Sequence, residues 1–483
     1  MTDAFLTIDL GTTRLKVATF APDGTLLEQR TARHAEYAAG NERWQNVDEW
    51  WRDTLRLGSH VVERLRIEGR RVLAVSVTGR AGAAIFTDAA GDVRFQPWSD
   101  DRHRAELAEL RAWRKGNADL SDYGAALLAK YLWLVRSDSR HRALIARAFY
   151  GKDFLLYRLT GAHYTDPSSG PDSLAWDPRA LERATIGAGV VPTPALPWRI
   201  AGGLGPEAAA ALGLPTGTPV VIGAHDGVSA NVGAGAARPH DWALTLGTHA
   251  VVRTVLSAAP EGARRFYGLP PDRHVLGGNA YMGGRSADWF IDVTTNDSIE
   301  ERAARFRSLD AAAADVPIGA RGIRFMPFLA GRIAPDSRPR ATASFTGLRT
   351  DHSRADLYRA VLEGTAFAIG AVYRQLSGWC GAARTMRVTG GGVASELWLQ
   401  MLAAVLEMPL EVTDSAVEGR GAAIFAAVAL GRHRDYDTAA DAMVHVTRRV
   451  LPDDALVAQY ESIYRHWLDV ERVTRGLDAG EIR

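Results

Sequence analysis

The sequence predicts an α/β protein made of two related domains, and three observations carry this prediction. The chain has 483 residues. Because a domain commonly spans ~150 residues, two large or three smaller domains are expected. Strand-like and helix-like segments are mixed along the chain, which is typical of the α/β class. A strand, a Gly-Thr turn and a second strand occur at residues 6–20 and again at residues 242–255.

Apolar runs, turn residues and helix-start residues define the elements expected before residue 238. Asp23-Gly24 predicts a hairpin turn, and Asp48 is the expected N-cap of the first helix. The expected strands lie at residues 5–10, 15–20, 25–27, 72–77, 85–87 and 220–222. The expected helices lie at residues 48–65, 127–135 and 149–159.

A proline-containing stretch with a polar end at residues 236–240 predicts a domain junction. We therefore expect an N-terminal domain at residues 1–238 and a C-terminal domain at residues 239–483. The strands expected in the second domain lie at residues 242–246, 250–255 and 386–389. The expected helices lie at residues 354–376, 395–406 and 419–430, and an amphipathic helix around residues 456–473 is expected to pack on this domain.

Composition excludes several classes of protein. Apolar residues make up 47% and charged residues 23%, which rules out wholesale disorder. Lys plus Arg is 57 against 56 for Asp plus Glu, so the net charge of +1 gives no reason to expect nucleic acid or an anionic membrane as a partner. The single cysteine, Cys380, excludes an internal disulfide and a multi-thiolate metal site and suits a reducing cytoplasm. No segment approaches the ~18 apolar residues of a spanning helix, and the start lacks signal-peptide features. A cytoplasmic location is therefore expected.

The first turn has the residue types of a phosphate site. Asp9 ends a strand and is followed by Gly11, Thr12 and Thr13. Glycine allows close approach of a ligand, the hydroxyls and turn N–H groups suit phosphate oxygens, and a carboxylate suits Mg²⁺. The alternative is a structural hairpin whose aspartate accepts local backbone bonds. Gly247-Thr248 supplies a second such turn from the other half of the chain.

Asp226 is the candidate catalytic carboxylate. It follows a short buried strand and lies between Gly223 and Gly227. A general base needs a rigid support and open space in front of it. The alternative is a helix N-cap, since a helix is able to begin at Gly227.

Three consecutive glycines at residues 390–392, followed by Ser395, lie between a strand and a helix. Such a turn leaves an unobstructed surface at a helix N-terminus, which suits a nucleotide. None of the four lysines lies in a Walker A frame. The histidines show no metal-ligand spacing.

Taken in order, these motifs resemble those of the FGGY family of carbohydrate kinases, which are ATP-dependent enzymes of the actin-like/hexokinase-like ATPase superfamily. The resemblance runs from about Leu6 to about Leu430. Residues 98–102 resemble the family's Trp-x-Asp-x-Arg substrate loop, and residues 418–423 resemble its element that closes over the base. The resemblance implies two ribonuclease H-like ATPase domains with a cleft between them, the first binding sugar and phosphate and the second binding nucleotide.

The resemblance also implies a role for each motif. Asp226 is the general base that takes the proton of the sugar hydroxyl, and Asp9 and Asp226 are the expected Mg²⁺ ligands. The residues expected to bind ATP are Thr12, Thr13, Gly247, Thr248, Gly391, Gly392 and Ser395. The residues expected to bind substrate are Arg80, Trp98, Asp100 and Asp226.

The turn after the expected strand at residues 72–77 departs from the family's relatives. Arg80-Ala81-Gly82 stands where xylulose kinases usually have Gln-Met-His and glycerol kinases Gln-Arg-Glu. This argues against glycerol and weakens a simple xylulose assignment. Arg80 offers a guanidinium fork to a substrate carboxylate, or it forms an ion pair with an acid such as Asp100. Trp98 is expected to stack on the sugar, with a packing role as the alternative, and Asp100 is expected to accept hydroxyl hydrogen bonds.

Residues 226–233 and 250–253 are similar to gluconate kinases, although His249 replaces their usual Ser. The overall length and the loop at residues 98–102 are closer to pentulose kinases. A ketopentose such as xylulose or ribulose is therefore the favoured substrate, and gluconate or another sugar acid is the alternative. An actin-like ATPase or a ligand-binding pseudo-kinase is the alternative of a different class. A homodimer is expected by analogy with relatives.

Overall fold

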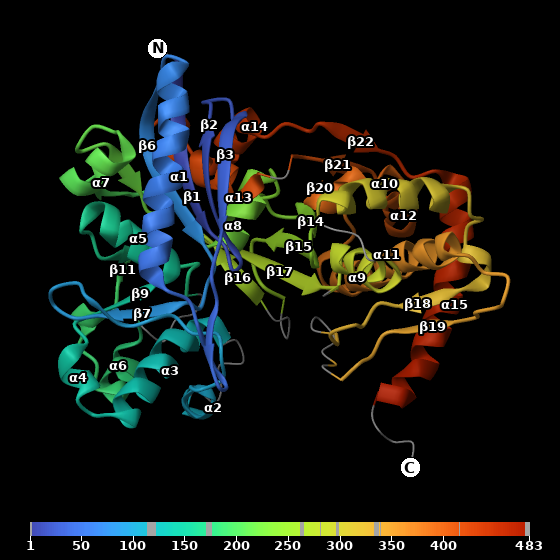
Figure 1. The fold of residues 1–483 in the computed structure, drawn as a ribbon, viewed down its shortest axis with the longest axis horizontal. Helices are drawn as coiled ribbons and strands as arrows, with labels where there is room; N and C mark the ends of the chain where they lie inside the picture. Colours follow the sequence, from blue (N-terminus) through green and yellow to red (C-terminus); the bar gives the residue numbers. More distant parts are fainter. Residues whose placement is uncertain are drawn as a thin grey trace. The chain divides into compact units, whose positions relative to one another are not determined.

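The computed structural model describes residues 2–113, 122–170, 176–260, 265–280, 282–295, 299–332, 338, 340–414 and 416–478 (Figure 1). The chain forms two compact units. Unit 1 comprises Met1–Ala237, Arg264–Arg273 and Ala416–Val444, and unit 2 comprises Arg238–Ala263, His274–Ser415 and His445–Arg483. Each unit combines a sheet with helices, so the predicted α/β class is confirmed. The boundary predicted after residue 238 stays a prediction, and the contacts add two later segments to unit 1.

The sheet of unit 1 has six strands in the order β12-β13-β6-β1-β2-β3. β1 is antiparallel to β2 and parallel to β6, and β6 is parallel to β13. The third strand is longer than predicted, because the β2–β3 hairpin continues to the pair Arg14–Arg33. The strand bounds are β1 Thr2–Leu10, β2 Arg14–Phe20, β3 Leu26–Arg33, β6 Arg70–Gly79, β12 Ile200–Gly203 and β13 Pro219–Val221.

Two helix starts in unit 1 differ from the prediction. Helix α1 (Val47–Ile67) begins after Asn46, whose side chain accepts the N–H of Asp48, so the N-cap is Asn46 and the predicted Asp48 is wrong. Helix α5 (Gly151–Thr160) begins two residues later than predicted. Phe149 and Tyr150 instead pair with Ile85 and Ala84 in a strand, because backbone pairing satisfies their N–H and C=O groups there.

Unit 1 also contains segments that are distant in sequence. Helix α13 (Val417–Ala429) packs against β1 and against α8 (Asp226–Gly233), and in Figure 1 its red-orange ribbon lies beside the blue strands. The other elements of unit 1 are β4 Tyr37–Ala39, β5 Glu42–Trp44, β7 Ala84–Thr87, β8 Val93–Phe95, α2 Arg104–Trp113, α3 Asp122–Ser137, α4 His141–Leu144, β9 Arg147–Tyr150, β10 Tyr164–Thr165, α6 Pro178–Ala184, η2 Ala188–Val190, β11 Thr193–Pro194, α7 Pro206–Leu212, β16 Arg265–Leu269 and α14 Tyr436–Met443.

Within unit 2 the strands run in the order β17-β15-β14-β20-β21-β22. β14 is antiparallel to β15 and parallel to β20. The long helix α11 (Arg354–Cys380) begins with a capping box between Ser353 and Asp356. The strand bounds are β14 Trp242–Leu246, β15 Ala250–Leu256, β17 Arg273–Asn279, β20 Met386–Thr389, β21 Leu410–Val412 and β22 Arg448–Val450.

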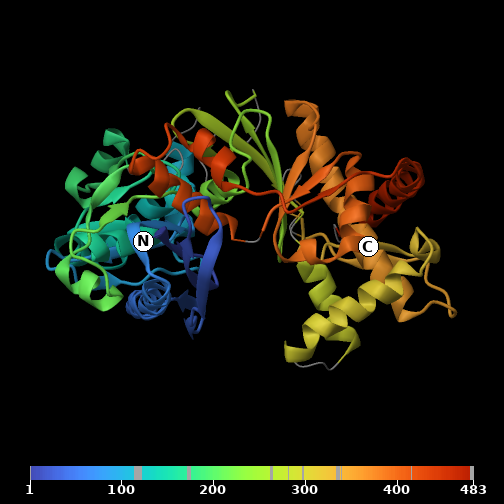
Figure 2. The same cartoon turned by 90° about the horizontal axis from the view of Figure 1, so that it is seen from above.

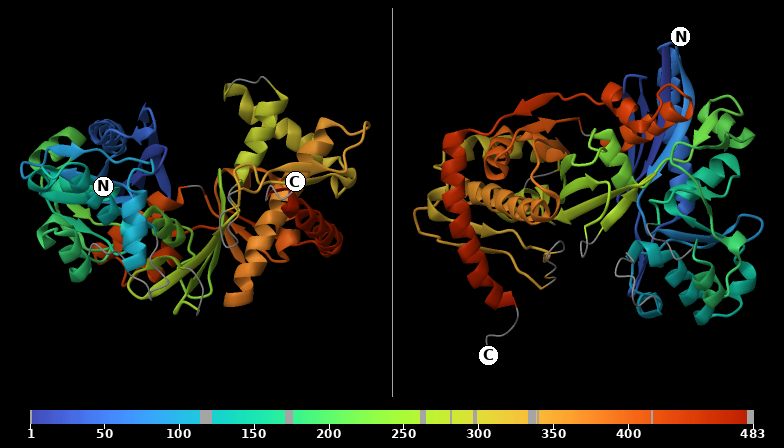
Figure 3. Two further views of the ribbon diagram at one scale, coloured as in Figure 1. Left: turned by 90° about the horizontal axis from the view of Figure 1, so that it is seen from below. Right: turned by 180° about the vertical axis from the view of Figure 1, so that it is seen from behind.

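The tail forms helix α15 (Asp454–Asp478), which packs on α11 and α12 (Glu396–Leu406) as predicted. Its red ribbon lies beside the orange helices in Figures 2 and 3. Tyr460, Tyr464 and Trp467 bury their rings in the core of unit 2. The remaining elements of unit 2 are α9 Gly284–Thr294, α10 Ile299–Ala314, η3 Ala320–Gly322, β18 Arg324–Met326, β19 Ser344–Thr346 and η4 Gly391–Ala394.

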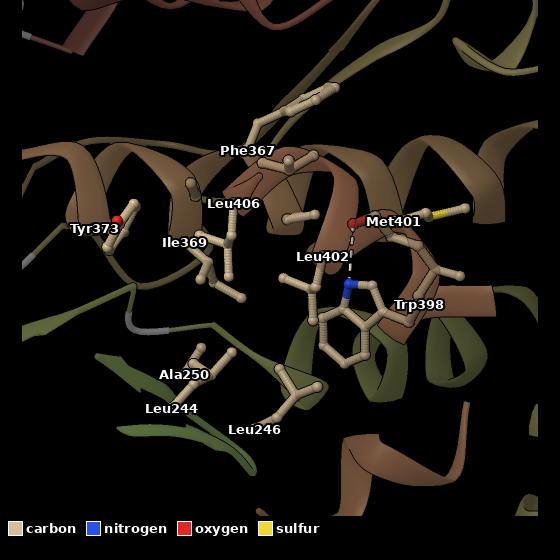
Figure 4. Close-up of a cluster of buried hydrophobic side chains, with 14 of the residues drawn as sticks. Leu244, Leu246, Ala250, Phe367, Ile369, Tyr373, Trp398, Met401, Leu402 and Leu406 are labelled. Carbon is tan, nitrogen blue, oxygen red and sulfur yellow. Dashed lines mark hydrogen bonds between the residues drawn. The ribbon is translucent and has the colours of Figure 1, made fainter. Parts of the chain in front are cut away.

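The core of unit 2 joins the two glycine turns that it contains. Leu244 and Leu246 of β14 pack in one cluster with Trp398 and Leu402 of α12 (Figure 4). The indole Nε1 of Trp398 donates a hydrogen bond to the carbonyl of Leu362 at 3.2 Å. The cluster therefore fixes the end of β14 against the start of α12. In the described part of the chain, every helix is too short or too polar to cross a membrane.

Candidate active site

Three neighbouring strands of unit 1 bring Asp9, Arg80 and Asp226 to one edge of the sheet. Asp9 is the register partner of Thr78, next to the end of β6. Arg80 follows that strand and donates its backbone N–H to the carbonyl of Leu10 at 3.0 Å. Gly79 forms a parallel bridge with His225, which precedes Asp226. Ligands of open α/β sheets bind beyond the carboxyl ends of such strands.

Asp9 is buried and shares a cation with a second carboxylate. The Nζ of Lys16 lies 3.0 Å from Oδ2 of Asp9 and 3.3 Å from Oε2 of Glu418. Burial raises the pKa of the Asp9 carboxyl to about 7; the ammonium of Lys16 opposes this shift, whereas the charges of Glu418 and Asp226 add to it. Among the described residues, the buried Oδ1 of Asp9 has no hydrogen-bond partner. This carboxylate therefore has an oxygen available for a cation.

Asp226 is the first residue of α8, and its side chain is 31% exposed. Its Oδ1 lies 2.8 Å from Nε2 of His225. The turn before it needs glycine at position 223, because φ is +66° and an added Cβ would lie 1.6 Å from the carbonyl oxygen of Val77. Asp226 therefore combines a rigid backbone with an accessible carboxylate, as a general base requires.

A buried polar cluster supports the segment that leads to Asp226. The Nζ of Lys152 lies 2.6 Å from Oδ1 of Asp153 and 3.1 Å from Oδ1 of Asp166, and all three side chains are buried. Buried side chains hold three peptide groups of the segment. Lys152 Nζ donates to Ile222 O (3.4 Å), and Thr78 Oγ1 donates to Ala224 O (2.8 Å). The N–H of His225 donates to Ser168 Oγ (3.1 Å). This support was not predicted from the sequence.

Arg80 is partly buried and has neutral hydrogen-bond partners. Its guanidinium donates to Oε1 of Gln45 at 3.1 Å and to the carbonyl of Thr12 at 3.5 Å, and its carbon lies 5.6 Å from the ring centre of Trp50. Among the described residues, its Nε has no partner. Burial lowers the pKa of Arg80, and the charges of Asp226 and Glu36 oppose this shift. The charge of Asp226 thus reaches Arg80 without an ion pair between them.

The alternative ion pair between Arg80 and Asp100 is wrong. Oδ1 of Asp100 accepts from Nε of Arg102 at 2.7 Å, and Oδ2 accepts the backbone N–H of Arg43 at 2.8 Å. Burial alone would raise the pKa of Asp100, but the hydrogen bonds from Arg102 and Arg43 outweigh it and lower the pKa. Asp100 is therefore ionised and held by its own loop and by β5.

Trp98 is 5% exposed, which supports the packing alternative. Its ring packs at 5.4 Å from that of Trp133, and the Arg102 guanidinium and the Lys130 ammonium each lie 5.0 Å from its centre. Little of the ring remains for a sugar to stack on, so the stacking role stays a prediction.

Lys130 is a buried cation that sequence reasoning did not single out. Its Nζ donates to the carbonyls of Gly82 (3.2 Å) and Trp98 (2.9 Å), which belong to the turn at residues 80–82 and to the loop at residues 98–102. Burial lowers its pKa to about 7, the charges of Arg80 and Arg102 lower it further, and the charge of Asp100 opposes them. Lys130 therefore joins the two loops without a carboxylate partner in the described part of the chain.

The substitution Lys130→Met tests this burial through the pH dependence of stability. The folded protein releases the Lys130 proton near pH 7, whereas an unfolded lysine keeps it to about pH 10. Since the unfolded state then binds more protons, stability rises with pH in this window. We expect the unfolding free energy of the wild type, relative to the variant, to increase by about 2 kcal/mol between pH 7.5 and 9. Denaturant titrations at both pH values measure it, and a constant difference would contradict it.

The first predicted phosphate turn is open to solvent. Thr12 and Thr13 are exposed, and their carbonyls accept hydrogen bonds from Gln45 (3.1 Å) and from the backbone N–H of His34 (2.9 Å). These bonds fix the turn through its backbone and leave the hydroxyls pointing away from the core. Their phosphate role stays a prediction.

Unit 2 brings the other predicted ATP residues together. Gly247 and Thr248 connect β14 to β15, and their carbonyls accept the N–H groups of Gly284 (2.7 Å) and Arg285 (3.2 Å). The glycine turn lies beside them, because Cβ atoms added at Gly390 and Gly392 would lie 2.7 Å and 2.6 Å from atoms of Leu246. A Cβ added at Gly391 meets open space. Ser395 uses its hydroxyl as the N-cap of α12, 3.1 Å from the N–H of Trp398.

Comparison with known proteins assigns the family. The FGGY N-terminal domain model matches residues 4–233, and the FGGY C-terminal domain model matches residues 243–430. The chain belongs to the FGGY family of carbohydrate kinases. The predicted family and fold are therefore confirmed, and the chain is an ATP-dependent carbohydrate kinase with a sugar and ATP as its ligands.

FGGY kinases with two substrate names are similar to the chain. A gluconokinase of Bacillus licheniformis is 27% identical, covering 98% of this chain and 96% of the relative. A xylulose kinase of Escherichia coli is 28% identical, covering 84% of this chain and 86% of the relative. Among solved structures, the xylulose kinase of Rhodospirillum rubrum is 26% identical with a TM-score of 0.83, covering 99% of this chain and 100% of that chain. The substrate therefore has to be argued from the site.

Proposed function

We propose that the chain transfers the γ-phosphoryl group of ATP to a hydroxyl of a small sugar acid such as gluconate. Unit 1 supplies the sugar and phosphate residues, and unit 2 supplies the nucleotide residues around Gly247, Thr248, Gly391, Gly392 and Ser395. This departs from the ketopentose favoured by the sequence. The change rests on the surroundings of Arg80.

Asp226 is the proposed general base. Its carboxylate takes the proton of the sugar hydroxyl, the hydroxyl oxygen forms a bond to the γ-phosphorus, and the bond from that phosphorus to the β,γ-bridging oxygen breaks to give ADP. Charge that develops at the transferred phosphoryl group is stabilised by hydrogen-bond donors placed to face it.

Asp9 and Asp226 fit a Mg²⁺ site. Mg²⁺ is usually held by one or two carboxylates together with substrate phosphates and waters. The described residues contain no cluster of three or more acidic, His or Cys side chains able to hold a metal, but the buried Oδ1 of Asp9 has no partner. When bound, Mg²⁺ neutralises phosphate charge.

The observation that carries the sugar-acid proposal is the partly buried guanidinium of Arg80, whose buried Nε has no partner among the described residues. A buried charge is costly unless it is paired, yet the described residues place neutral acceptors beside Arg80. The charge of Arg80 also lowers the pKa of the nearby Lys130. A substrate carboxylate would offset this excess positive charge and accept a two-point hydrogen bond from the guanidinium.

Release of ADP in the presence of Mg-ATP tests the proposal, with D-gluconate, D-xylulose, D-ribulose, L-ribulose, glycerol and no sugar compared. We expect the highest kcat/KM with D-gluconate. A preference for a ketopentose would overturn the sugar-acid assignment and retain the kinase. Equal ADP release with and without each sugar would show that none of these sugars is phosphorylated.

The substitution Arg80→Gln tests the carboxylate contact. A hydrogen bond to a charged group contributes ~1.5–3 kcal/mol, so kcat/KM for D-gluconate is expected to fall by roughly 10–100-fold. Glutamine keeps a polar side chain near Gln45 and Thr12. The internal control is D-xylulose, which has no carboxylate and whose kcat/KM is expected to change by less than about 3-fold. An equal loss for both sugars would contradict the contact.

The second candidate substrate is a ketopentose. Asp100 favours it, because its carboxylate is ionised, held in place by Arg102 and Arg43, and suited to accept sugar hydroxyls. Several relatives are also named xylulose kinase. A homodimer and a cytoplasmic location stay predictions.

A further inference from the structure

His225 and Asp226 form a hydrogen-bonded pair at the start of α8. Nε2 of His225 lies 2.8 Å from Oδ1 of Asp226, and the His225 side chain is 13% exposed. Within the part of the chain that the structure describes, the buried Nδ1 has no hydrogen-bond partner. A hydrogen on Nδ1 would be a buried donor without an acceptor. The ring therefore carries its hydrogen on Nε2 and donates it to Asp226.

The imidazole ring is fixed on two sides. Tyr267 packs edge-on against it, with ring centres 5.1 Å apart and planes at 67°. Gly227 lies under the ring, because a Cβ added there would be 2.7 Å from Cε1 of His225. The Tyr267 hydroxyl donates to the carbonyl of Gly227 at 2.9 Å and so ties the ring's neighbours to α8.

The backbone of His225 is also fixed. Its N–H donates to Oγ of Ser168 at 3.1 Å, and Ser168 in turn donates its own N–H to Oδ2 of Asp166 at 2.8 Å. Asp166 is paired with the buried Lys152 at 3.1 Å. Both the backbone and the ring of His225 are therefore held in place. The Nε2–H of the ring donates to Oδ1 of Asp226.

We propose that His225 is a positioning residue for the general base: its Nε2–H binds Oδ1 of Asp226 and fixes the orientation of the carboxylate that takes the proton of the sugar hydroxyl. This inference rests on the proposed role of Asp226. A carboxylate whose rotation is restricted loses less orientational freedom when the sugar hydroxyl and phosphate align. The effect belongs to the chemical step, so it changes kcat more than the binding of sugar or ATP.

A pair of variants in the full-length protein tests the proposal. His225→Leu removes the donor and keeps a side chain of similar bulk, whereas His225→Gln retains an N–H donor at about the position of Nε2. We expect His225→Leu to lower kcat by roughly 10-fold, with the KM values for sugar and ATP changed by less than about 2-fold. We expect His225→Gln to recover kcat to within about 3-fold of the wild type.

A matched control separates positioning from loss of stability. His141 is another half-buried histidine of unit 1, with Nδ1 2.9 Å from the carbonyl of Leu134. His141→Leu is expected to lower the melting temperature without lowering kcat. Equal kcat losses in His225→Leu and His225→Gln, or a rise in KM at unchanged kcat, would overturn the proposal.

A double variant keeps this inference separate from the assignment of the base. If Asp226 is the base and His225 acts through it, His225→Leu has no further effect on kcat in the Asp226→Asn background. Wild-type turnover in Asp226→Asn would overturn the base assignment, and the inference with it. Loss of turnover in Asp226→Asn together with wild-type kcat in His225→Leu would overturn the inference alone.

Discussion

Asp226→Asn is expected to lower kcat by ~10²–10⁴-fold or more while the fold is retained. The amide has nearly the shape of the carboxylate but does not accept the proton of the sugar hydroxyl. Loss of the negative charge also weakens the proposed Mg²⁺ site and the field at Arg80, which the charge of Asp226 reaches. Steady-state ADP release with the preferred sugar measures the loss.

Stability measurements complete this prediction. The Asp226 side chain is 31% exposed, so the isosteric change is expected to alter the unfolding free energy by less than about 1 kcal/mol. Asp53→Asn is the matched control, because Asp53 is 27% exposed on α1 and pairs with Arg56 at 2.6 Å. That variant is expected to keep wild-type turnover. Wild-type turnover in Asp226→Asn would remove Asp226 from the role of base.

The sequence was sufficient to predict the strands and turns that depend on a local residue pattern. Strand–turn–strand units at both Gly-Thr turns follow from short apolar runs broken by glycine, and both are present. The residues around Asp226 were enough to predict that it follows a buried strand. In the structure it is the first residue of α8. The boundaries were less predictable, because Asn46 and Asp48 are both good N-caps and the choice depends on where the chain enters α1.

The contacts around the site were not predictable, because they join distant parts of the chain. Lys16 and Glu418 are 402 residues apart, and no local pattern indicates that they meet beside Asp9. The resemblance assigns residues 418–423 to the element that closes over the base, which stays a prediction; that α13 packs with β1 and α8 in unit 1 was not predicted. The contact with α8 needs glycine at 421, since an added Cβ would lie 2.0 Å from the carbonyl oxygen of Ser229.

One compositional feature coincides with the site, although the sequence alone did not indicate this. The chain has four lysines among 57 basic residues, at positions 16, 115, 130 and 152. Position 115 lies outside the described residues. Of the other three lysines, Lys16 pairs with Asp9, and Lys130 joins residues 80–82 to residues 98–102. Lys152 supports the segment that leads to Asp226. A compact ammonium fits a small buried cavity where the planar guanidinium of arginine does not. Each of the three described lysines lies in a polar cluster of the site, a relation that the sequence alone did not predict.

Lys152→Met is expected to lower the unfolding free energy by about 3–5 kcal/mol. Lys152 is fully buried between Asp153 and Asp166, and methionine fills the space of its alkyl chain without the charge. Both carboxylates would then lose the cation that stabilises their ionised forms, and Ile222 would lose its donor. Denaturant or thermal unfolding at pH 7 measures the change.

Asp153→Asn is the matched control for that prediction. Burial raises the pKa of Asp153 to about 6, although Lys152 opposes the shift. Neutralising Asp153 leaves the Lys152–Asp166 pair intact, so a loss of less than about 1.5 kcal/mol is expected. Similar losses in the two variants would mean that packing, and not the buried charge, sets the stability of this cluster. A large loss confined to Lys152→Met would show that the peptide leading to Asp226 rests on the lysine's charge.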